Sequence, residues 1–108
     1  MSGADIHQRA HLARLAAVQS RLQALSDKAL ERHISLCEAL YAEQASRYPN
    51  TFPIPRNQSP AWWHWNYVTS AAITTEIVEA NRELRARAAA RRDDGILRGK
   101  HLNGSVIG

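Results

Sequence analysis

Two pairs of side chains have the types and the spacing found in chemically active sites. His7 and His11 lie four residues apart, and on a helix this spacing lets two imidazoles bind one metal ion. His33 and Cys37 have the same spacing, and a cysteine beside a histidine can be activated as a nucleophile. The first pair therefore suggests a metal-binding site, and the second suggests covalent catalysis. Both functions are weighed below against the rest of the sequence.

The surrounding residues favour neither chemistry. A zinc-protease motif needs glutamate where the chain has Gln8, and no acidic or cysteine ligand is placed to complete a metal site. Cys37 lies in an apolar helical stripe with Ile34 and Tyr41, which is typical of a buried, inert thiol. The sequence contains no Gly-rich phosphate loop and no serine-hydrolase motif. We therefore predict no enzymatic activity, no metal site and no cofactor.

The segment from Ala61 to Tyr67 contains all three tryptophans of the chain. Trp62 and Trp65 fall on an apolar helical face, whereas Trp63 and Tyr67 fall on another. Because tryptophan, tyrosine and arginine dominate the energetic centres of protein interfaces, we predict that Trp63 and Tyr67 contact a partner. One alternative is that the preceding loop covers both rings with Phe52 and Ile54. Another is that the two rings stack on nucleic-acid bases.

The net charge of +4 lies entirely in the C-terminal quarter of the chain. Residues 1–79 carry seven basic and seven acidic side chains, whereas residues 80–108 carry seven basic and three acidic ones. A guanidinium group pairs well with phosphate or carboxylate. We predict that this region binds a charged macromolecule, and the alternative is a solvated helix end that the helix dipole stabilises. The predicted contact residues are Arg82, Arg85, Arg87, Arg91 and Arg92.

The distribution of proline and glycine predicts how these residues are positioned. All four prolines lie within residues 49–60, whereas residues 4–48 and 61–94 contain neither proline nor glycine. This pattern predicts two helical stretches around a Pro-rich loop. In the first stretch, two offset apolar stripes meet near Ser26, a good capping residue, which favours an antiparallel hairpin of helices 5–25 and 27–48. The alternative is one helix of about 66 Å, which would imply a dimer.

The second stretch has a clear beginning and a weak end. Ser59 is a good N-cap and Pro60 a good first helical residue. Apolar residues recur every three to four positions as far as Leu84, after which alanines and arginines follow, so we expect a helix that frays near Arg92 and a flexible tail over 93–108. The predicted core packs Trp62, Trp65, Val68, Ile73, Ile77 and Leu84 onto Leu15, Val18, Leu22, Leu25, Ile34, Leu36, Leu40 and Tyr41.

Together these observations predict one all-α domain over residues 1–108, a small helical bundle. The single cysteine, the lack of a secretory signal and the lack of a long apolar run predict a cytoplasmic protein without a membrane span. The predicted function is a non-enzymatic adaptor or inhibitor that binds another macromolecule, most simply a protein. The alternatives are a dimeric DNA-binding accessory protein whose C-terminal arginines contact phosphates, and a subunit of a larger helical assembly.

Overall fold

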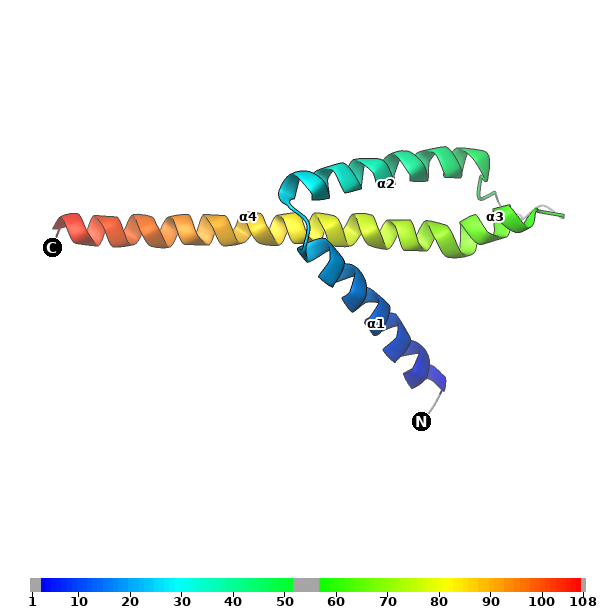
Figure 1. The fold of residues 1–108 in the computed structure, drawn as a ribbon, viewed down its shortest axis with the longest axis horizontal. Helices are drawn as coiled ribbons and strands as arrows, with labels where there is room; N and C mark the ends of the chain where they lie inside the picture. Colours follow the sequence, from blue (N-terminus) through cyan, green and yellow to red (C-terminus); the bar gives the residue numbers. More distant parts are fainter. Residues whose placement is uncertain (1–2, 52–56, 108) are drawn as a thin grey trace.

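The computed structural model describes the backbone of residues 3–51 and 57–107, and the side chains within residues 5–51 and 57–96. This part of the chain is helical and contains no strand, which confirms the predicted all-α class. Figure 1 shows that the last three elements run on as one rod. The elements are α1 (Gly3–Gln23), α2 (Asp27–Arg47), α3 (Pro60–His64), the π-helical turn η1 (Trp65–Thr69) and α4 (Ser70–Ile107).

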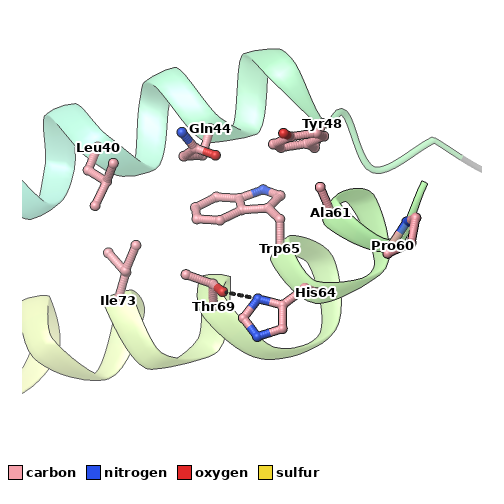
Figure 2. A pocket seen from close by; sticks show the side chains of 9 residues that line it. All are labelled: Leu40, Gln44, Tyr48, Pro60, Ala61, His64, Trp65, Thr69 and Ile73. Carbon is pink, nitrogen blue, oxygen red and sulfur yellow. Dashed lines mark hydrogen bonds between the residues drawn. The ribbon is translucent and has the colours of Figure 1, made fainter. Parts of the chain in front are cut away.

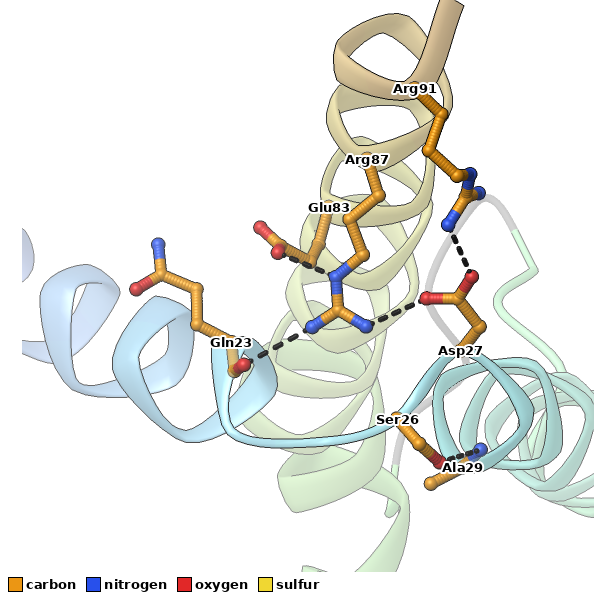
Figure 3. Close-up of polar contacts among 7 residues, drawn as sticks. All are labelled: Gln23, Ser26, Asp27, Ala29, Glu83, Arg87 and Arg91. Atoms are coloured by element: carbon orange, nitrogen blue, oxygen red, sulfur yellow. Dashed lines mark hydrogen bonds and ion pairs between the residues drawn. The ribbon is translucent and has the colours of Figure 1, made fainter. Parts of the chain in front are cut away.

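The break between α1 and α2 lies at the predicted position. Ser26 has an extended backbone, and its Oγ accepts a hydrogen bond of 3.1 Å from the backbone N–H of Ala29 (Figure 3). This cap satisfies an N–H group that has no partner within the helix. The alternative of one helix of about 44 residues is therefore wrong. At the second predicted start, the Ser59 Oγ accepts in the same way from the N–H of Trp62.

The two N-terminal helices reverse direction at the predicted turn and complete a three-helix arrangement with α4, but they splay apart instead of packing closely side by side (Figure 1). α2 lies along α4, whereas α1 crosses α4 near the α1–α2 turn and then diverges from it (Figure 1). The apolar residues of both helices converge on one small side chain of α4, because Leu22 of α1 and Leu30 of α2 are buried against Ala80. The alanine lets both helices approach α4 closely, so α4 takes the place of a direct α1–α2 interface.

A second buried group lies where α3 and η1 meet the end of α2. Trp62 and Trp65 are buried there, as predicted, together with Ile73 of α4. The Trp62 indole N–H donates a 2.9 Å hydrogen bond to the carbonyl oxygen of Pro49, which ties the start of the Pro-rich loop to α3. The Trp65 ring packs edge-on against Tyr41, with 5.3 Å between ring centroids.

The π turn explains why Val68 is exposed although it was predicted to be in the core. In η1 the backbone N–H of Ser70 donates to the carbonyl of Trp65, five residues earlier, so the turn holds one residue more than an α-helical turn. Three residues beyond Trp65 the chain has therefore not returned to the core face, and Val68 is 54% exposed. Predicted core residues Leu36, Leu40 and Tyr41 are also exposed, because α2 presents a narrower face to α4 than the apolar pattern implied.

α4 continues well beyond its predicted end. The sequence predicted a helix end near Arg92, which is wrong because the backbone is helical as far as Ile107; the flexible tail over 93–108 stays a prediction. The run of alanine and arginine after Leu84 has high helix propensity, which favours the helix as far as Arg92. Among the described residues, no helix combines the length and the hydrophobicity that crossing a membrane requires.

The resulting arrangement is open rather than compact. The Cα radius of gyration is 20.8 Å and the longest dimension is 76 Å, whereas a compact domain of this length has a radius of gyration of about 13 Å. The accessible surface is 8319 Å², compared with about 6,000 Å² expected for a compact monomer of this mass. A long α4 that is only partly covered by α1 and α2 accounts for the difference.

The core assignment predicts a large loss of stability on truncating one leucine of α2 and almost none on truncating another. Leu30→Ala should lower the free energy of unfolding by about 2–4 kcal/mol, because Leu30 is fully buried and truncation leaves a cavity. Leu36→Ala should change it by less than about 0.5 kcal/mol, because Leu36 is 64% exposed. Urea denaturation followed by circular dichroism measures both values. Equal losses in the two variants would contradict this packing.

Candidate functional site

Trp63 and Tyr67 form an exposed aromatic patch on the outer side of α3 and η1. Their rings are stacked, with centroids 5.2 Å apart and an angle of 23° between the ring planes. Trp63 is 44% and Tyr67 59% exposed, while the buried Trp62 contacts both rings edge-on. The structure therefore confirms that this pair lies off the core face. The residues predicted as its alternative cover, Phe52 and Ile54, lie outside the described residues.

The aromatic patch borders an open groove between α1 and the start of α4. The groove has a volume of about 440 Å³, and Tyr67 forms part of its wall. Leu15 and Val18 line it from α1, and Val68 lines it from η1. This α1–α4 groove exists because α1 diverges from α4, and it extends the aromatic patch into a larger apolar surface. Sequence reasoning missed it, because the direction of α1 is not encoded in local spacing.

A second hollow of about 520 Å³ lies between the end of α2 and η1 (Figure 2). Its walls are mainly apolar, and the buried Trp65 ring of η1 faces Leu40 of α2 and Tyr48, the residue that follows α2. The ionisable group at its edge, His64, has its Nδ1 2.8 Å from the Thr69 hydroxyl oxygen. The described lining offers apolar contact rather than paired acid and base groups.

Arg87, predicted as a partner contact, instead holds three parts of the fold together (Figure 3). Its guanidinium donates to Asp27 of α2 at 2.8 Å, to the backbone carbonyl of Gln23 at the end of α1 at 3.1 Å, and to Glu83 at 2.9 Å. Its side chain is only 22% exposed. Arg91 donates to the other carboxylate oxygen of Asp27, also at 2.8 Å. Three of these four hydrogen bonds fasten the α1–α2 turn to α4, and the fourth, to Glu83, lies within α4.

The other three predicted arginines differ in their availability. Arg82 donates to Glu79 at 2.8 Å, and this buried carboxylate also accepts a hydrogen bond from Gln19 of α1 at 3.2 Å. Arg85 and Arg92 are exposed and make no ion pair within the described part of the chain. The structure therefore separates the five predicted arginines into three that make ion pairs within the fold and two that make none among the described residues.

The histidine and cysteine of α2 do not form a catalytic relay. The Nε2 of His33 lies 3.6 Å from the Cys37 Sγ and 3.5 Å from a carboxylate oxygen of Glu76, which also pairs with Arg21. Because both partners face the same ring nitrogen, the histidine cannot pass a proton between them through its two nitrogens, as a catalytic triad requires. Burial also raises the pKa of the Cys37 thiol, which favours its unreactive protonated form.

Metal binding has no support in the geometry. Within the described residues, no cluster of three or more histidine, cysteine, aspartate or glutamate side chains is placed to hold a metal ion. Glu76 and Glu79 face α1 across its interface with α4, where Glu76 pairs with Arg21 and Glu79 accepts a hydrogen bond from Gln19. Their spacing from Gln19 and Arg21 in the sequence gave no local signal of this contact.

The Asp27 contact predicts a defined pH dependence of stability. Hydrogen bonds from Arg87 and Arg91 lower the pKa of Asp27 below its ordinary value, so its contribution to stability is complete above the unfolded-state pKa of about 3.9. That contribution is lost as the pH falls through the lower, folded-state pKa. Asp27→Asn should therefore lower the Tm at pH 7, and the difference from wild type should shrink towards pH 2.5. Asp93→Asn, at an exposed carboxylate of α4, is the matched control. A Tm difference for Asp27→Asn that is equal at both pH values would contradict this role.

Comparison with known proteins found no relative of this chain. No protein-family model, no curated protein and no solved structure matches the chain.

Proposed function

We propose that this chain is a non-enzymatic adaptor or inhibitor that acts by binding another protein. The observation that carries the proposal is the continuous apolar surface formed by the aromatic patch and the α1–α4 groove. Exposed, stacked Trp63 and Tyr67 rings beside a groove provide rigid apolar area at a low entropic cost, which is typical of the centres of protein interfaces.

The open shape of the chain supports the same function. The chain exposes about 2,300 Å² more surface than a compact monomer of its mass, and a stable protein interface buries about 800 Å² of each partner, so the excess is large enough to contain one. A fold that served only as a compact catalytic scaffold would not need to leave α1 diverging from α4. We propose that the open arrangement presents contact surfaces, and that the chain does so in the cytoplasm.

The DNA-binding alternative has less support. It required the five predicted arginines to be available for phosphates, but Arg87 and Arg91 are bound to Asp27, and Arg82 is bound to Glu79. Only two of the five remain without an internal partner among the described residues. Because DNA affinity depends on the number of phosphates neutralised, this arrangement favours a protein partner over a nucleic acid.

Affinity capture with a double variant of the aromatic patch tests the proposal. Trp63→Ala with Tyr67→Ala should reduce the amount of the main captured protein by at least about tenfold, because each hot-spot residue contributes about 2 kcal/mol to binding. Wild-type and variant chains are compared at equal concentration in extracts of the producing cells, with quantitative mass spectrometry as the readout. The aromatic patch is exposed, so the variant should keep its helical circular dichroism spectrum.

The matched control is Ile6→Ala with Leu36→Ala, which removes two other exposed apolar side chains from α1 and α2. The control should capture as much of the protein as wild type does. Equal capture by all three chains would contradict the proposal. Capture of duplex DNA that disappears as salt is raised would support the alternative instead.

A further inference from the structure

We propose that an uncovered face of α4 binds an acidic amphipathic helix of a partner protein. Its residues alternate at intervals of four and three, which places them in one stripe along a helix. Positions at this spacing face one neighbouring helix, and three of the six are arginines, so the stripe is a face of mixed charged and apolar character. The open face of α4, as we name it, consists of Val78, Arg82, Arg85, Ala89, Arg92 and Ile96.

No helix in the described part of the chain covers this stripe. α1 and α2 pack on α4 around Ala80 and Leu84, which lie on another side of the helix, and α4 continues alone beyond the α1–α2 turn (Figure 1). Val78 and Ile96 remain exposed although both are apolar and β-branched. A partner that covered them would gain the free energy of removing this apolar area from water.

The positive charges of the open face indicate that its partner carries carboxylates. Arg85 and Arg92 lie seven residues apart and have no acidic partner among the described residues. The carboxylate of Glu79 is buried beside Gln19, and that of Glu83 is bound to Arg87, so neither is free to neutralise them. Carboxylates on the partner, two helical turns apart, would complement both arginines.

Two other occupants fit the open face less well. A second copy of the chain would bring its own Arg85 and Arg92 to the interface, and like charges in contact oppose association. A DNA backbone would neutralise the arginines but would offer no apolar surface to Val78 or Ile96. An acidic amphipathic helix satisfies the charged and the apolar positions together, because apolar and acidic residues can alternate at the same spacing.

This inference rests on the proposed function only in assuming that the partner is a protein. The open face lies on α4, whereas the aromatic patch lies on α3 and η1, so separate variants distinguish the two. Loss of binding at the open face would leave capture through Trp63 and Tyr67 unaffected, and the reverse also holds.

The test uses a synthetic 21-residue peptide, a length that spans the stripe of about 27 Å from Val78 to Ile96. The peptide carries leucines at the positions opposite Val78, Ala89 and Ile96, and glutamates opposite the arginines. Fluorescence anisotropy at 0.1 M salt should give micromolar binding to the full chain. Arg85→Glu with Arg92→Glu should weaken binding at least tenfold.

The matched control is Arg9→Glu with Arg32→Glu, which changes the net charge equally at exposed arginines of α1 and α2. It should weaken binding less than twofold, and a scrambled peptide of the same composition should bind at least tenfold more weakly. If the glutamate variant loses helical content, Arg85→Gln with Arg92→Gln replaces it. The proposal is overturned if the peptide does not bind, if both double variants lose affinity equally, or if a 20-base-pair duplex competes with the peptide for Arg85 and Arg92.

Discussion

The structure depends on how one short turn is fastened to one long helix. Asp27 begins α2, and it accepts hydrogen bonds from Arg87 and Arg91 of α4, while Arg87 also binds the carbonyl of Gln23 at the end of α1. These contacts fix where both N-terminal helices leave the turn. Beneath them, the small side chain of Ala80 lets both helices reach α4.

This fastening leaves part of the molecule uncovered. α2 follows α4, but α1 departs at an angle and opens a groove beside the aromatic patch (Figure 1). α4 also continues past the last fastening residue, Arg91, and presents a face that neither shorter helix reaches. The exposed apolar and basic surfaces are therefore consequences of the fold, and they are the surfaces on which we base the proposed interactions.

Local signals in the sequence were sufficient for the elements but not for their arrangement. Ser26 and Ser59 indicated where two helices begin, because a capping side chain accepts a hydrogen bond from a backbone N–H only three residues away. Val68 was misplaced because no residue type marks a π turn, whose extra residue changes which positions within the turn face the core. The internal contact of Arg87 was not predicted because its partner Asp27 lies 60 residues away, and a charged side chain on a helix looks the same in sequence whether it faces solvent or another helix. The direction of α1 could not be predicted for the same reason, because it also depends on contacts between residues far apart in the sequence.

The central claim is that the chain is open, with α1 and α2 packed separately on α4. Small-angle X-ray scattering tests it most directly, at concentrations where light scattering gives the 12.1 kDa mass of one chain. The structure predicts a radius of gyration near the 20.8 Å of its Cα atoms. A radius near the roughly 13 Å of a compact domain would contradict this account, because the 38-residue α4 is by itself about 57 Å long and would not fit in so small a particle.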